Sequence, residues 1–272
     1  ITGENEPQHA ELLRPPEQGG MGLDALWNDD FHHSATVAAT GAFEAYYTET
    51  RGAPQELISA LKWGFLYQGQ YYAWQKKRRG HPSLDLPARA FIQCLQNHDQ
   101  VANSARGQRL HQLTSPGRHR ALTALMLLTP CTPLLFQGQE FAASAPFLYF
   151  ARHGEELDPL IRKGRHEFLT QFPHIGSADG GKLLAPPNEE ETFTRCKLDH
   201  GERERHAPVL RMHRDLLRLR REDPMFSRQD SACMHGAVLG AEAFLLRFMV
   251  AAGNHHLLLV NHGDTLPLRR PT

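Results

Sequence analysis

Short apolar segments that end in clusters of polar residues recur along this chain. Residues 90–95 run into the polar cluster 96–100, and residues 134–136 run into the polar cluster 137–140. Between them, residues 116–129 have the apolar spacing of a helix. Short apolar runs of this kind are typical of buried parallel strands, and their alternation with helices is typical of a β/α barrel. The pattern therefore predicts part of such a barrel, with its chemistry at the carboxyl ends of the strands.

The remaining segments complete the predicted barrel and indicate a smaller all-β part after it. Residues 1–4 have the composition of the end of a buried strand, and residues 27–33 have that of a polar and aromatic loop. Helices are expected within residues 54–79 and over residues 206–222. Beyond Pro224 the runs 243–248 and 256–260 are strand-like. We therefore expect an α/β fold in which a partial barrel over residues 1–222 precedes a partial all-β domain over residues 223–272.

Charge and cysteine content exclude several classes of protein. Lysine plus arginine and aspartate plus glutamate number 30 each, and no basic stripe stands out, so neither nucleic acid nor a membrane surface is an expected partner. The four cysteines form no Cys-x-x-Cys pair and are far apart, which predicts free thiols in a reducing compartment, the cytoplasm. The 17 histidines include no His-Glu-x-x-His motif, and we expect no metal or other cofactor.

Two acidic residues lie at predicted strand ends in polar surroundings. They are Glu4, within Thr2 to Glu6, and Asp99, within residues 96–100. Hydrolysis of a glycosidic bond needs two carboxyl groups that flank the bond, so a barrel that brought these two together would supply such a pair. Each residue also has a structural interpretation, Glu4 as a solvated loop acid and Asp99 as part of a helix cap.

The segment Asn97-His98-Asp99 resembles the segment at the end of the seventh barrel strand in the α-amylase family of glycoside hydrolases. The resemblance implies that Asp99 hydrogen-bonds sugar hydroxyls and stabilises the transition state, and that His98 and Asn97 bind the same ring. It also implies that residues 1–222 hold barrel strands five to eight. Glu4 then matches the general acid/base at the end of the fifth strand. Such a glutamate must be protonated near neutral pH, so burial or a nearby carboxylate must raise its pKa.

Further segments resemble the malto-oligosyltrehalose trehalohydrolases within that family: residues 25–33, 96–101, 107–110, 164–168 and 192–199. This resemblance implies hydrolysis of the α-1,4 bond next to the terminal trehalose unit of maltooligosyl trehalose. The aromatic and acidic residues of the segment 25–33 would form a wall for the trehalose side, since sugar rings stack on aromatic faces and carboxylates accept their hydroxyl hydrogen bonds. These residues are Trp27, Asp29, Asp30, Phe31 and His32. The structural alternative is that Trp27 and Phe31 belong to the core.

The family's nucleophile, an aspartate in an Arg-x-Asp pattern at the fourth strand, has no counterpart here, because only three residues precede Glu4. We therefore expect this chain to be a carboxyl-terminal fragment that is inactive alone. Two alternatives stay open. One is an α-glucan branching or debranching enzyme, and the other is a non-catalytic glucan-binding relative that has lost the nucleophile.

Overall fold

The strands predicted at residues 1–4, 90–95 and 134–136 belong to one parallel sheet, together with a strand that the pattern did not predict. The computed structural model describes residues 1–176, 184–249 and 255–266. The sheet consists of β1 (Thr2–Gly3), β2 (Ala25–Trp27), β5 (Phe91–Cys94) and β6 (Thr132–Leu134), in that spatial order. All three neighbouring pairs are parallel. Parallel neighbours in chain order are what a run of barrel strands produces, and the expected partial barrel is confirmed.

Four longer helices pack around this sheet: α1 (Asp29–Thr40), α2 (Pro54–Trp63), α5 (Pro116–Leu128) and α11 (Ala207–Glu222). The predictions for residues 116–129 and 206–222 are confirmed. The helix predicted within residues 54–79 ends at Trp63, where Gly64 adopts a φ of +79°. A Cβ at Gly64 would lie 2.6 Å from the ring of Phe91. Only glycine therefore lets α2 end so close to β5.

The segment 27–33 differs from its predicted loop. It is the end of β2 followed directly by the first turn of α1. The side chain of Asn28 caps α1 by accepting a hydrogen bond from the backbone N–H of Phe31 at 3.2 Å. Asp29 and Asp30 occupy the first turn, where negative charge is favourable. The polar composition thus marked a helix start, and the loop prediction was wrong.

Shorter elements connect these helices and strands. A hairpin of β3 (Tyr71–Tyr72) and β4 (Lys77–Arg78) follows α2, within the range that had predicted a helix. The long connection after β6 carries several helices, which the sequence pattern did not resolve. A further helix as long as α1, α6 (Asp158–Leu169), lies in this connection. The short helices are α3 (His98–Ala102), α4 (Leu110–Leu113), α7 (Pro173–Gly176), α9 (Glu190–Arg195), α10 (Glu202–Arg205) and α12 (Pro224–Ser227).

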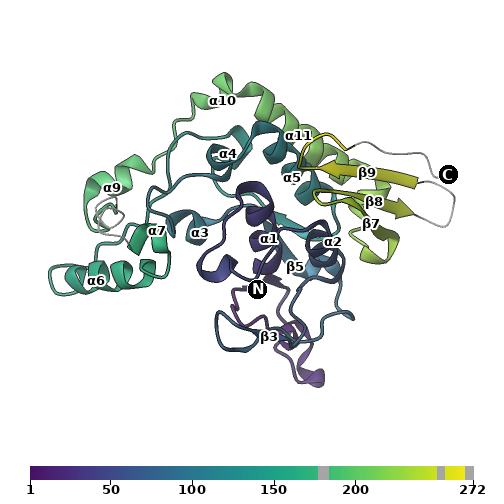
Figure 1. The fold of residues 1–272 in the computed structure, drawn as a ribbon, viewed down its shortest axis with the longest axis horizontal. Helices are drawn as coiled ribbons and strands as arrows, with labels where there is room; N and C mark the ends of the chain where they lie inside the picture. The colour runs from purple at the N-terminus through teal and green to yellow at the C-terminus, as the bar shows by residue number, and fades with distance from the viewer. Residues whose placement is uncertain (177–183, 250–254, 267–272) are drawn as a thin grey trace.

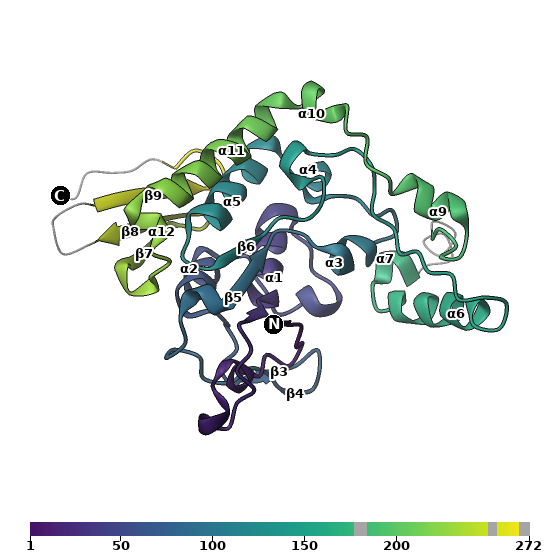
Figure 2. The same cartoon turned by 180° about the vertical axis from the view of Figure 1, so that it is seen from behind.

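A three-stranded antiparallel sheet follows α12, formed by β7 (Met234–Gly240), β8 (Ala243–Met249) and β9 (His255–Asn261). Two of these strands were predicted, and β7 was missed. In Figure 1 the sheet lies beside α2, α5 and α11, and α6, α7 and α9 lie at the opposite end of the molecule. The reverse view in Figure 2 shows the same arrangement.

One continuous apolar core joins the antiparallel sheet to the helices. Fully buried side chains of β8, among them Phe244 and Leu246, pack with Leu57 and Leu61 of α2 and with Leu122 of α5. The boundary near residue 223 stays a prediction, because this core extends across it. Among the described residues, no helix combines the length and the apolar character needed to cross a bilayer.

Candidate active site

The predicted acids Glu4 and Asp99 lie at the same edge of the parallel sheet. Glu4 directly follows β1, and Asp99 lies in the first turn of α3, just after β5. The strand between them is β2, and Asp29 follows it. Because parallel strands end at one edge, the chain topology collects the three carboxyl groups there.

The three carboxyl groups interact electrostatically, and the effect is resolved in the pKa of Asp29. Burial raises the pKa of Asp29 from 3.8 to about 7. Arg79 opposes this shift, whereas the negative charges of Asp30, Glu4 and Asp99 add to it. Glu4 and Asp99 are therefore both near enough to Asp29 to act on its ionisation. Glu4 itself is exposed, so of the two surroundings expected for it the structure provides the neighbouring carboxyl, Asp29, and not burial.

Asp99 is held in place by residues on two elements. The amide of Asn103 donates a hydrogen bond to its carboxylate at 3.0 Å. Arg165 of α6 in turn donates to the side-chain oxygen of Asn103 and to the backbone oxygen of Ala102. The Arg165 guanidinium also lies over the ring of Tyr149, 4.8 Å from its centre. The carboxylate thus has a fixed direction, which transition-state stabilisation requires.

The other residues of the Asn-His-Asp segment play different parts. Asn97 is 1% exposed, and its side-chain oxygen accepts hydrogen bonds from the backbone of Asp99 and Gln100. It therefore caps α3 and orients Asp99, which is the structural interpretation weighed above. His98 is exposed, and its ring meets the edge of Trp27 with centres 6.0 Å apart. His98 and Trp27 therefore form a T-shaped pair of rings beside the carboxyl groups.

Two residues of the predicted sugar wall belong to the interior instead. Phe31 has no exposed surface and packs in the main core with Leu57 and Leu61. Asp30 is 3% exposed, and one of its oxygens accepts hydrogen bonds from the backbone N–H groups of Leu66 and Tyr67. Neither side chain can touch a substrate, so the prediction for these two residues was wrong. Both face inward because α1 is buried at every position over residues 30–35.

A buried arginine that the sequence pattern did not single out supports the acidic residues. Arg79, at the end of the β3–β4 hairpin, is 2% exposed and lies over the ring of Tyr72, 4.9 Å from its centre. Its guanidinium is 3.5 Å from Asp30 and 4.0 Å from Asp29. A buried cation next to two carboxylates offsets part of their mutual repulsion. Nothing in the local sequence distinguished Arg79 from its neighbours Lys77 and Arg78.

The chain is similar to curated proteins of one kind. It is 42% identical over 241 residues to the malto-oligosyltrehalose trehalohydrolase of Deinococcus radiodurans, covering 87% of this chain and 39% of that protein. The trehalohydrolase of Brevibacterium helvolum is 36% identical, with 82% of this chain and 38% of that protein covered. This chain is a relative of the malto-oligosyltrehalose trehalohydrolases. It spans about two fifths of the length of these trehalohydrolases. No protein-family model matches it.

Solved structures agree with this relationship. A putative α-amylase from Salmonella typhimurium superposes with a TM-score of 0.83 at 33% identity, over 100% of this chain and 47% of that one. A cyclic α-maltosyl-(1→6)-maltose hydrolase from Arthrobacter globiformis has a TM-score of 0.52 at 14% identity, covering 96% of this chain and 41% of that one. The second likeness shows the fold alone. Together they confirm the α-amylase type of β/α barrel that the trehalohydrolase resemblance implied.

The burial of Asp29, to which the neighbouring acids add, predicts a pH-dependent stability. Its folded-state pKa of about 7 exceeds the reference value of 3.8, so the folded protein holds this proton more tightly and loses stability as pH rises between these values. The Asp29→Asn variant has no carboxyl group to titrate at this position, so this fall in stability with rising pH should disappear. Relative to the unchanged protein, the variant should gain up to about 4 kcal/mol in unfolding free energy between pH 4 and pH 8. Denaturant unfolding measures this difference, and parallel pH curves would contradict it.

The corrected place of Phe31 predicts a contrast with Trp27. Phe31→Ala should lower the free energy of unfolding by about 3–5 kcal/mol, because it opens a cavity in the main core. Trp27→Ala, at a half-buried ring, should cost only about 1 kcal/mol. Chemical denaturation of both variants measures the contrast. Equal losses would show that Phe31 is not the core residue that its burial indicates.

Proposed function

We propose that the full-length protein, meaning this chain together with the remaining length of its trehalohydrolase relatives, is a glycoside hydrolase. It cleaves the α-1,4-glucosidic bond next to the terminal trehalose unit of maltooligosyl trehalose and releases trehalose. The observation that carries the proposal is the convergence of Glu4 and Asp99 at one edge of the sheet, where both act on Asp29. The relatives' shared name supports the choice of substrate.

In this proposal each residue of the site has a distinct task. Glu4 protonates the leaving oxygen and then activates water as a base, in the manner of a retaining glycosidase. Its exposure allows it to reach a substrate. The nucleophile is the fourth-strand aspartate that the family resemblance implies, outside this sequence.

Asp99 accepts hydrogen bonds from the hydroxyls of the glucose ring that is cleaved. It is preorganised by Asn103, so little reorientation accompanies the formation of the oxocarbenium-like transition state. The exposed His98 and the edge-on Trp27 supply a polar and an aromatic contact for the same ring. The partner is a glucan. The unbridged thiols of the four cysteines support a place in the cytoplasm.

Product analysis tests this function. The full-length protein is incubated with maltooligosyl trehalose and, separately, with a plain maltooligosaccharide of equal length. We expect trehalose from the first and hydrolysis of the second that is at least about 10-fold slower. Equal rates would indicate a general amylase, and new branch points a branching enzyme. Glucan binding without turnover would indicate the non-catalytic relative, and each of these results would overturn the proposal.

The Arg165 contact predicts a positioning role that activity can reveal. Arg165→Ala should lower kcat by about 10- to 100-fold, because Asn103 then loses the partner that fixes its hold on Asp99. KM should change much less, since Arg165 contacts no proposed substrate atom. Arg162→Ala on the same helix, whose side chain points to Asn188 instead, is the matched control. A loss confined to KM would contradict the positioning role.

A further inference from the structure

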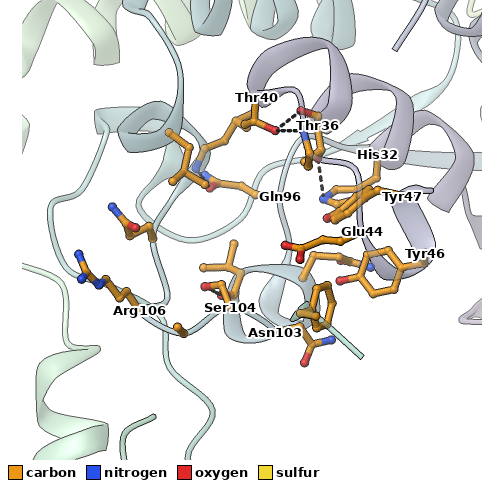
Figure 3. Close-up of a pocket in the computed structure, with 18 of the residues that line it drawn as sticks. His32, Thr36, Thr40, Glu44, Tyr46, Tyr47, Gln96, Asn103, Ser104 and Arg106 are labelled. Atoms are coloured by element: carbon orange, nitrogen blue, oxygen red, sulfur yellow. Dashed lines mark hydrogen bonds between the residues drawn. The ribbon is translucent and has the colours of Figure 1, made fainter. Parts of the chain in front are cut away.

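A cavity of about 510 Å³ lies next to the carboxyl groups but is lined by other residues. It is bounded by α1, by the turn that leads to Tyr46 and Tyr47, and by the segment from Leu95 to Leu110, as Figure 3 shows. Neither Glu4 nor Asp99 lines it. Its wall does contain Asn103, the residue that holds Asp99. The cavity therefore lies behind the proposed catalytic group and shares one wall residue with its support.

Three residues that line this cavity each carry a buried polar atom that has no hydrogen-bond partner among the described residues. His32 and Gln96 are each 2% exposed, yet the Nδ1 atom of His32 and the side-chain nitrogen of Gln96 have no hydrogen-bond partner. The side-chain oxygen of Gln100, on the same wall, is also buried without a partner. Buried polar atoms without partners are costly, and a ligand that supplied donors and acceptors would remove that cost. The unpaired atoms include both donors and acceptors, so the matching ligand carries groups that can act as both, as hydroxyls do.

The rest of the lining indicates a neutral ligand with apolar faces. The rings of Tyr46 and Tyr47 and the side chains of Leu95 and Leu110 supply aromatic and aliphatic surface. Burial lowers the pKa of His32 to about 4, so this side chain is neutral near pH 7. The charged residues of the wall are of opposite sign, Glu44 and Arg106, so the cavity has no net preference for an anion or a cation.

Cavities of this volume accommodate small ligands with a few polar anchors on a mainly apolar wall. Hydroxyl groups on the rim of a ring that also has apolar faces are the distinguishing chemistry of a hexose. We propose that this cavity, lined by His32, Gln96 and Gln100, binds one neutral sugar of one or two hexose units, at a site separate from the carboxyl groups. The predicted sugar contact of His32 is then made in this cavity and not in a wall shared with Phe31.

The test separates this site from the proposed catalytic one. Titration calorimetry follows maltose and trehalose binding to the full-length protein carrying Trp27→Ala and Asp99→Asn, which removes contacts at the carboxyl edge. We expect one bound sugar per chain to persist in this background. Glucose 6-phosphate should bind at least about 10-fold more weakly, because the wall carries no net charge to offset the cost of burying a phosphate.

Two further substitutions, each made in the same background, address the cavity itself. Gln100→Ala should weaken maltose binding about 5- to 10-fold by removing one hydrogen bond. Ala42→Trp, which places an indole in the lining, should abolish it. Gln18→Ala, at an exposed glutamine far from the cavity lining, is the matched control and should leave binding unchanged.

The results that would overturn the cavity site differ from the result that would overturn the proposed function. Loss of all sugar binding in the double variant, or equal affinity in the control and in Gln100→Ala, would overturn the cavity site. Thermal unfolding of each variant identifies misfolding, and Gln100→Ala, in a solvent-accessible short helix, provides the decisive comparison if Ala42→Trp does not fold. Trehalose release is measured in parallel on the protein without substitutions. Its absence would overturn the proposed function and leave the result for the cavity standing.

Discussion

Asp99→Asn in the full-length protein should lower trehalose release by about 10³-fold or more, with the midpoint of thermal unfolding almost unchanged. The reason is that the amide has no negative charge to stabilise the positive charge that develops on the ring, and its nitrogen cannot accept a hydroxyl hydrogen bond as the second carboxylate oxygen does. A loss of this size corresponds to about 4 kcal/mol of transition-state stabilisation. The fold should tolerate the change, because Asp99 is partly exposed and its side chain accepts one hydrogen bond, from Asn103.

The measurement is the initial rate of trehalose release, with unfolding followed on the same samples. Asp215→Asn, at an exposed position of α11 that pairs with Arg218, is the matched control. Normal turnover in Asp99→Asn would refute the role of Asp99. A loss of activity that accompanied a lower unfolding midpoint would assign the effect to folding instead.

Glu4→Gln should be rescued by an activated substrate far more than Asp99→Asn is. A leaving group that departs without a proton, such as fluoride, makes the general acid unnecessary, whereas it leaves the need for transition-state stabilisation unchanged. With natural substrate, Glu4→Gln should be about 10²- to 10⁴-fold slower than the unchanged protein. With a maltooligosyl fluoride, most of that loss should disappear.

Glu17→Gln provides the control, because Glu17 is exposed in a short 3-10 helix, Pro16–Gln18, between β1 and β2. The two rescue ratios are compared directly, each as the rate with fluoride divided by the rate with natural substrate. Equal ratios for Glu4→Gln and Asp99→Asn would count against Glu4 as the acid.

The sequence pattern predicted the parts of the fold that depend on local periodicity. The parallel strands beside residues 90–95 and the helices over residues 116–129 and 206–222 follow directly from apolar spacing. The strand β2 was not recognised, because three residues are too few to display a period. The same holds for β3 and β4, which have two residues each. Their pairing partners, far along the chain, are what make them strands.

The site was predictable at the level of strand ends but not of side-chain direction. Glu4 and Asp99 could be placed at one edge because the order of parallel strands determines it. Phe31 and Asp30 were assigned to a sugar wall because composition cannot tell which side of a helix turn faces solvent. Arg79 reaches Asp29 and Arg165 reaches Asn103 only through tertiary contacts, whereas Asn103 holds Asp99 from one helical turn away. Only Arg165 had a sequence signal, since it lies in the segment 164–168 that resembles the family.

The central claim is that Glu4 and Asp99 act together on one glucose ring, and a double-mutant cycle tests it most directly. The rates of Glu4→Gln, Asp99→Asn and the double variant are measured with natural maltooligosyl trehalose. Residues that serve one transition state are strongly non-additive. We therefore expect the double variant to be within about 10-fold of the slower single variant. A double loss equal to the product of the two single losses would mean that the two carboxyl groups act independently, and it would contradict the account.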